Sequence, residues 1–142
     1  MTFATYALSV GAGTLALSPI PESAGQVGAW DAVLSMTTTS EMPRDLVDGL
    51  KARTLWLHFP VADFGVPEDD ALWPPIAAQL HGVLQTGGSV LVHCKGGCGR
   101  SGMAALRLMV EAGEDPHLAF ARLRDVRPCA VETEAQLAWA VL

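Results

Sequence analysis

Apolar runs without polar alternation predict several short buried strands along this chain. The β-prone segments cover residues 6–10, 14–18, 32–36, 54–59 and 89–94. A strand that is covered on both faces reads as a continuous apolar run, because neither face meets water. We therefore expect these segments to form the sheet of a layered fold.

Helical patterns dominate the second half of the chain. The clearest segments cover residues 74–85, 101–112, 116–126 and 133–142. Two of them open on a proline, which suits a first helical turn, and glycines follow the end of the first. Strands interleaved with helices predict an α/β fold with a central, mostly parallel sheet of about four to five strands flanked by helices. We expect a single domain over residues 1–142.

Composition narrows the classes of function. The 142 residues are 50% hydrophobic, and 9 Lys and Arg against 15 Asp and Glu give a formal net charge of -6. Such a chain is not suited as a whole to coating nucleic acid or anionic lipid, so any bound anion requires a local site. No apolar run approaches the roughly 20 residues of a membrane span, and the start of the chain lacks the basic region of a secretory signal. These features predict a cytoplasmic protein.

The cysteine count predicts reduced thiols. Three cysteines, at positions 94, 98 and 129, are an odd number for a chain of this size, which argues against a disulfide framework. Their spacing also lacks the close pairs that are typical of structural zinc sites. We therefore expect no metal and no cofactor, and one cysteine as a candidate nucleophile.

A glycine-rich loop joins the strand at 89–94 to the helix that follows it. Its residues are His93-Cys94-Lys95-Gly96-Gly97-Cys98-Gly99-Arg100-Ser101. Unpaired amides of a first helical turn and the helix dipole together favour a bound anion such as phosphate. The glycines can take the positive φ values that turn successive amides inward, and Arg100 supplies a planar fork that matches two phosphate oxygens. We expect residues 95–100 to hold a substrate phosphate.

Cys94 opens this loop, so the field that holds an anion also favours its thiolate, which is a ready nucleophile. Ser101 is expected to hydrogen-bond to the departing sulfur, and a role as helix N-cap is compatible with this. His93 is expected to support the loop by donating hydrogen bonds to its carbonyl groups.

The segment from His93 to Ser101 resembles the His-Cys-x5-Arg-Ser signature of protein tyrosine and dual-specificity phosphatases. Residues 60–67 and 123–127 are further matches, to the cyclin-dependent-kinase-associated phosphatase branch, and the resemblance covers about Leu55 to Leu142. It implies a metal-independent phosphomonoester hydrolase that forms a phosphocysteine on Cys94. It also implies a phosphorylated protein or peptide as substrate, and an active site that accepts phosphate, sulfate or vanadate.

Asp63 is the candidate general acid, since the leaving oxygen of a phosphomonoester needs a proton. It follows the predicted strand at 54–59, and parallel strands end at one edge of a sheet; the family resemblance places the acid here too. Three neighbouring acids, Glu68, Asp69 and Asp70, suit the start of a helix instead. The segment at 130–136 is similar to the family's glutamine-bearing loop, which implies that Gln136 positions the water that hydrolyses the phosphocysteine.

Two other functions stay open at this point. A non-catalytic module could bind a phosphorylated residue with the same loop, and Lys95 would suit a phosphoinositide. A reversible disulfide between Cys98 and Cys94 is a further hypothesis, beside the simpler one that Cys98 fills space. Three arginines, at 122, 124 and 127, follow a helical face, where internal or solvated structural roles are expected.

Overall fold

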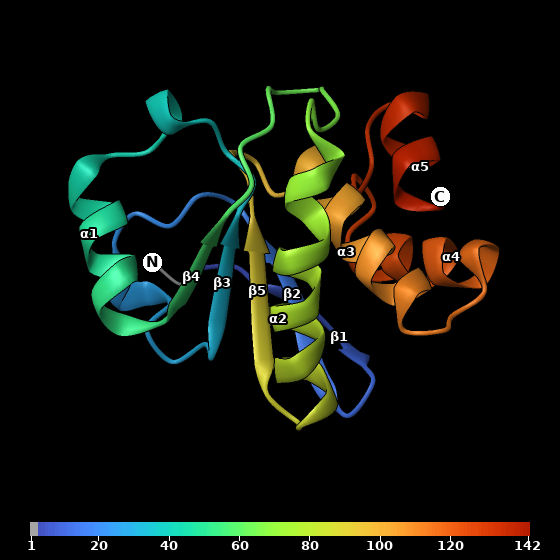
Figure 1. Ribbon diagram of the computed structural model, residues 1–142, viewed down its shortest axis with the longest axis horizontal. Helices are drawn as coiled ribbons and strands as arrows, with labels where there is room; N and C mark the ends of the chain where they lie inside the picture. Colours follow the sequence, from blue (N-terminus) through green and yellow to red (C-terminus); the bar gives the residue numbers. More distant parts are fainter. Residues whose placement is uncertain (1–2) are drawn as a thin grey trace.

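The apolar runs pair into one sheet with the order β1-β2-β5-β3-β4 (Figure 1). The structure is a computed structural model that describes residues 3–142. The strands are β1 (Tyr6–Val10), β2 (Gly13–Ser18), β3 (Ala32–Ser35), β4 (Leu55–His58) and β5 (Ser89–His93). Four of them are parallel, and β1 runs antiparallel to β2. The predicted single-domain α/β fold with a mostly parallel sheet is confirmed.

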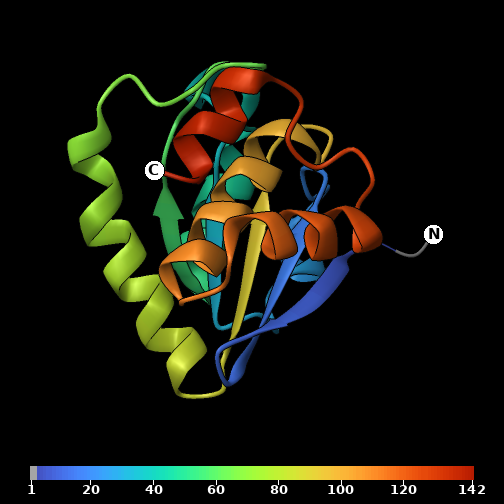
Figure 2. The same ribbon diagram turned by 90° about the vertical axis from the view of Figure 1, so that its right-hand side faces the viewer.

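Helices cover both faces of this sheet. α2 (Trp73–Gln85), α3 (Gly99–Glu111), α4 (Pro116–Val126) and α5 (Glu134–Ala140) lie on one face, as Figure 2 shows. The opposite face is covered by α1 (Arg44–Arg53) and a short 3-10 turn, η1 (Ala24–Gln26). Two more such turns, η2 (Thr39–Glu41) and η3 (Asp70–Leu72), lie in loops. Within residues 3–142, α1 is the one α-helix that the apolar pattern did not predict.

Successive residues of the central strands point into opposite layers. On β5, Val90 and Val92 pack in the core beneath α2 to α5, whereas Leu91 packs in the smaller core beneath α1. On β2, Leu15 packs in the larger core and Ala16 packs in the smaller one. Because both layers are apolar, these strands show no polar alternation, as expected for a sheet covered on both sides.

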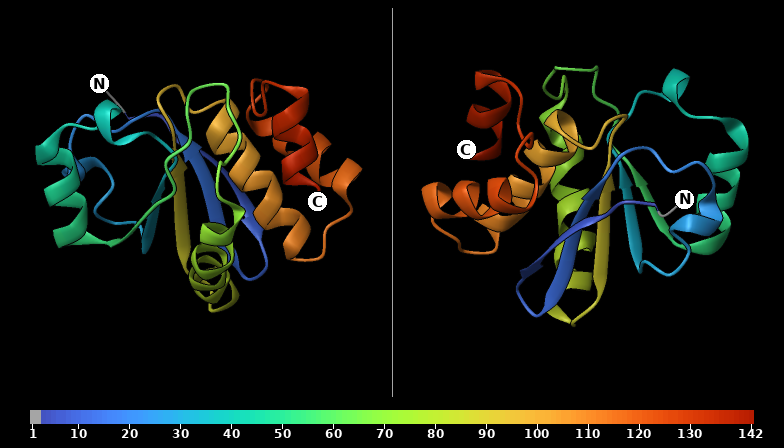
Figure 3. Two further views of the ribbon diagram at one scale, coloured as in Figure 1. Left: turned by 45° about the horizontal axis from the view of Figure 1, so that its top comes forward. Right: turned by 180° about the vertical axis from the view of Figure 1, so that it is seen from behind.

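The parallel strands end at a common edge, which is the upper edge in Figure 1 and comes forward in the left view of Figure 3. β3 leads there into η2, β4 leads into a loop at residues 59–69, and β5 leads into the glycine-rich loop. Segments that are far apart in the sequence therefore meet at this edge. Among residues 3–142, no helix has the length and apolar character needed to cross a membrane.

Candidate active site

The glycine-rich loop is seated against the end of β2. The amide of Ile20 donates to the carbonyl of Lys95 at 3.0 Å. Gly97 has φ +76, and a Cβ at this position would lie 2.6 Å from the carbonyl carbon of Ser18. Only glycine meets both conditions. Gly96 and Gly99 do not adopt a positive φ, so one glycine, rather than three, provides the left-handed turn that the sequence suggested.

Cys94 lies at the base of a cavity of about 250 Å³. Its side chain is 3% exposed, and its Sγ lies 3.3 Å from Ser101 Oγ. Helix α3 begins at Gly99 with Cys98 as its N-cap residue, so Ser101 sits inside the first turn and is not the N-cap. The rest of the cavity is lined by Asp63, Phe64, Lys95, Gly96, Cys98 and Glu132.

Arg100 is buried beside this cavity and is held by Glu41, a residue that sequence reasoning missed. Arg100 Nη1 donates to Glu41 Oε1 at 2.7 Å and to the carbonyl of Val61 at 2.8 Å, and Nη2 donates to Glu41 Oε2 at 2.9 Å. Arg100 Nε has no hydrogen-bond partner among residues 3–142. The terminal edge of the guanidinium is thus occupied by protein, and the edge that carries Nε is the one left for an anion.

The charges of this pair reinforce each other. The hydrogen bond from Arg100, more than any other contact, lowers the pKa of Glu41 to about 2, against the opposing effect of burial. Burial disfavours the charge on Arg100, but the hydrogen bond to Glu41 and the charges of Cys94 and Asp63 outweigh it and raise the Arg100 pKa. Both groups therefore stay ionised throughout the neutral range.

Asp63 lies across the cavity from the loop. Its Oδ1 is 3.5 Å from Arg100 Nη2, and its side chain is 53% exposed. The same oxygen accepts from the amide of Phe64, which has φ +61 and is itself exposed. The loop at residues 59–69 thus brings a carboxylate and an aromatic ring to the rim of the cavity. Asp69 instead accepts from the amide of Ala71 and caps η3, as expected for an acid at a helix start.

His93 closes a buried chain of hydrogen bonds that ends on the loop. Trp56 Nε1 donates to Ser35 Oγ at 2.9 Å, Ser35 Oγ lies 2.6 Å from His93 Nε2, and His93 Nδ1 lies 3.1 Å from the carbonyl of Cys94. A carbonyl only accepts, so the proton of a neutral imidazole sits on Nδ1 and Ser35 donates to Nε2. Burial lowers the pKa of His93 to about 4, which keeps the ring neutral.

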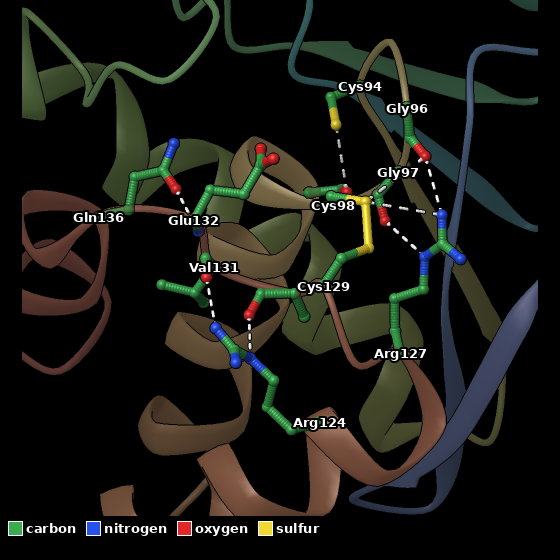
Figure 4. Close-up of a disulfide and its surroundings, with 12 residues drawn as sticks. Cys94, Gly96, Gly97, Cys98, Arg124, Arg127, Cys129, Val131, Glu132 and Gln136 are labelled. Atoms are coloured by element: carbon green, nitrogen blue, oxygen red, sulfur yellow. Dashed lines mark hydrogen bonds between the residues drawn. A yellow bond between two sulfur atoms is a disulfide. The ribbon is translucent and has the colours of Figure 1, made fainter.

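A disulfide joins Cys98 to Cys129 and ties the loop to the segment between α4 and α5 (Figure 4). The expectation of three reduced thiols is therefore wrong, and Cys98 is paired with Cys129 rather than with Cys94. Folding brings the two Cα atoms to 5.1 Å, within disulfide range, across 31 residues of sequence. The parity of the cysteine count cannot reveal such a pair, because it also allows one bond and one free thiol. Cys94 is that free thiol within residues 3–142.

Two arginines at the carboxyl end of α4 hold the glycine-rich loop and the segment between α4 and α5. Arg127, which follows the helix, donates to the carbonyls of Gly96 at 2.9 Å and Gly97 at 3.1 Å (Figure 4). Arg124 donates to the carbonyls of Ala130 and Val131. These contacts agree with the structural roles expected for the arginines of this helix.

Gln136 does not line the cavity. It is fully buried, its Oε1 accepts from the amide of Glu132 at 2.8 Å, and its Nε2 donates to the carbonyl of Gly65 at 3.1 Å. Glu132 lines the cavity in its place and packs over Gly99. Val131 has φ +67, an unusual conformation for a β-branched residue, and this bend presents Glu132 to the loop. The role of Gln136 in positioning water stays a prediction.

Comparison with known proteins agrees with this arrangement. A model of the PTP-SAK family, described as Swiss Army Knife protein, DSP-PTPase phosphatase domain, matches residues 26–139. Cyclin-dependent kinase inhibitor 3 of Mus musculus is 39% identical over 71 residues, which are 49% of this chain and 33% of that protein. The chain therefore matches only about a third of the length of this curated relative.

Solved structures share the fold over most of the chain. Kinase associated phosphatase (KAP), crystallised with its catalytic-site cysteine replaced by serine, has a TM-score of 0.86 and 23% identity over 99% of this chain and 93% of its own. Tk-PTP in its active form has a TM-score of 0.76 and 32% identity, over 88% of this chain and 87% of its own. PTPMT1 in complex with PI(5)P has a TM-score of 0.78 and 18% identity, over 96% of this chain and 92% of its own.

Proposed function

Because this chain belongs to the DSP-PTPase phosphatase family, we propose that it hydrolyses phosphomonoesters through a phosphocysteine on Cys94. The observation that carries this proposal is the shared cavity. Cys94 and Asp63 line it together, and Asp63 lies 3.5 Å from the buried guanidinium of Arg100. A nucleophile, an acid and an anion holder thus come from two loops at one edge of the sheet.

In the first step the thiolate of Cys94 attacks phosphorus while the Nε edge of Arg100 holds two of the phosphate oxygens. The S–P bond forms and the P–O bond to the leaving group breaks. Asp63, in its protonated form, donates its proton to the leaving oxygen, so that a neutral alcohol or phenol departs. The amino end of α3 adds positive potential where the charge of the phosphoryl group is greatest.

In the second step water attacks the phosphocysteine. Asp63, now ionised, takes a proton from the water as the new P–O bond forms. The S–P bond breaks and returns the electron pair to sulfur as a thiolate, which accepts a hydrogen bond from Ser101, 3.3 Å away. The products are inorganic phosphate and the enzyme in its starting state, and none of these steps draws on a metal or another cofactor.

The proposed substrates are phosphorylated proteins or peptides, as for protein tyrosine or dual-specificity phosphatases. A phosphoinositide is a second candidate, because a structure of similar fold is described with PI(5)P. A module that binds a phosphorylated residue without turnover is a third, and one neighbouring structure is named a phosphatase-like interacting protein. The presence of both Cys94 and Asp63 favours an enzyme over this last function.

Hydrolysis of p-nitrophenyl phosphate in the presence of EDTA tests the proposal. We expect turnover by the wild type, none by Cys94→Ser, and a reduction of about 100-fold or more for Asp63→Asn, as is usual when a general acid is lost. Asp69→Asn is the matched control, since Asp69 caps η3 outside the cavity. Activity of Cys94→Ser equal to that of the wild type would exclude the phosphocysteine mechanism.

A further inference from the structure

A groove of about 220 Å³ lies beside the catalytic cavity, on the outer side of the α4–α5 connection. Its walls include Phe120 and Leu137, both half-buried, and its rim carries Glu132 and Glu134, both exposed. Glu132 also lines the catalytic cavity, so the two hollows share this side chain as a common wall. A molecule bound at Cys94 can therefore extend across Glu132 into the groove.

The two glutamates on the rim have no ion-pair partner among residues 3–142. The cation of the groove, Arg124, donates to the carbonyls of Ala130 and Val131 and lies over the ring of Phe120. The donors of Arg124 are thus directed at the backbone, whereas the carboxylates remain available to a ligand. An apolar wall topped by unpaired carboxylates suits a side chain with an alkyl stem and a cationic head.

The groove lies beside the anion site, and this position indicates the charge of the ligand that the groove accepts. The buried Nε of Arg100 has no protein partner in residues 3–142, which marks the neighbouring cavity as the place for the phosphoryl group. A further phosphate on the same ligand would then approach the carboxylate of Glu132. A polyphosphorylated lipid headgroup is therefore disfavoured here, and a ligand with a positive charge near its phosphate is favoured.

We propose that this groove binds a lysine or arginine side chain that lies one to three residues from the phosphorylated residue of a protein substrate. The inference rests on the proposed function, and it names the substrate as a phosphopeptide with a neighbouring basic residue. Glu132 and Glu134 are the residues that determine this specificity, the first from the wall between the hollows and the second from the amino end of α5.

A phosphopeptide series tests the inference. The peptides differ at one position, which carries Lys, Ala or Glu, and this position is moved through three residues on each side of the phosphorylated residue. At low ionic strength we expect the best Lys peptide to exceed its Glu counterpart in kcat/KM by about threefold to tenfold, since an exposed charge pair contributes only modestly. Added salt should reduce this ratio.

Glu134→Gln should lower the ratio of Lys to Glu peptides toward one, because it removes one of the two carboxylates of the groove. Glu22→Gln, which removes the same charge near η1 on the opposite face of the sheet, should leave the ratio unchanged. A ratio near one in the wild type at every position, or a ratio that Glu134→Gln does not alter, would overturn the inference. So would a higher kcat/KM for dioctanoyl PI(5)P than for every peptide.

Failure of the proposed catalytic function can be distinguished from failure of the proposed groove. If the wild type hydrolyses neither p-nitrophenyl phosphate nor any peptide, catalysis is refuted, and the groove is then judged by binding. Cys94→Ser and fluorescein-labelled forms of the same peptides give affinities without turnover. Tighter binding of the Lys peptide, lost in the Cys94→Ser/Glu134→Gln double variant, would support the groove, and equal affinities would overturn it.

Discussion

The buried imidazole of His93 makes the stability of this fold dependent on pH in a defined window. Its pKa is lowered from 6.5 to about 4 by burial, so the unfolded chain binds a proton that the folded chain rejects. Between these two pKa values the unfolded state binds more protons, and the free energy of unfolding therefore falls as the pH falls. Below pH 4 both states are protonated, and this contribution stops changing.

The magnitude follows from the two pKa values. A full shift of this size corresponds to about 3 kcal/mol, because each unit is worth about 1.36 kcal/mol. Lowering the pH from 7.5 to 4.5 removes most of this contribution, about 2–3 kcal/mol. Glu41 adds little in this range, since its pKa moves from 4.5 to about 2 and its contribution is lost at lower pH.

Urea unfolding followed by tryptophan fluorescence, at constant ionic strength between pH 4.5 and 7.5, measures the effect. His93→Asn is the reference, because the asparagine amide can still donate to the carbonyl of Cys94 but cannot titrate. The wild type should lose about 2–3 kcal/mol more than this variant across the window. Parallel pH profiles for the two proteins would refute the reasoning, since they would mean that His93 is not a neutral buried group.

Three further predictions concern the supports of the loop. Glu41→Gln should lower kcat/KM for p-nitrophenyl phosphate about tenfold, because it weakens two charge-assisted hydrogen bonds that orient Arg100, while Asp45→Asn on α1 should have no effect. Cys129→Ser should lower the free energy of urea unfolding by about 3–4 kcal/mol, as expected for a closed loop of this length, and dithiothreitol should have the same effect on the wild type but none on the variant. Gln136→Leu should cost about 1–3 kcal/mol in the same assay, since it leaves buried partners unpaired; an unchanged stability would contradict the buried network.

Much of the fold could be predicted because its signals are local. Each predicted strand lies within one residue of its observed ends, since buried parallel strands are continuous apolar runs. α1 was not predicted because its buried residues are Leu46 and Leu50, with polar residues and Gly49 around them. This helix covers its face of the sheet through a narrow apolar contact, and its sequence pattern is correspondingly weak.

The parts of the site that sequence reasoning missed depend on long-range contacts. Glu41 lies 59 residues from Arg100 in the sequence. The local pattern around Glu41 is a capping box with Thr38, which accounts for the glutamate without its contact to Arg100. Glu132, which the sequence did not single out, lines the cavity because the bend at Val131 presents its side chain to the loop. Backbone bends of this kind are set by tertiary hydrogen bonds and are not encoded in a short motif.

The disulfide at Cys98 gives one short loop two sulfur oxidation states at once. Residue 94 must keep its sulfur reduced to be a nucleophile, while four positions later the chain is cross-linked. A reductant strong enough to rescue an oxidised nucleophile can therefore also open the cross-link, which leaves the hydrogen bonds from Arg127 and from the amide of Val131 to hold the loop on that side. The thiol content of the buffer thus becomes an experimental variable in its own right, and rates measured with and without dithiothreitol describe two covalent forms of the protein.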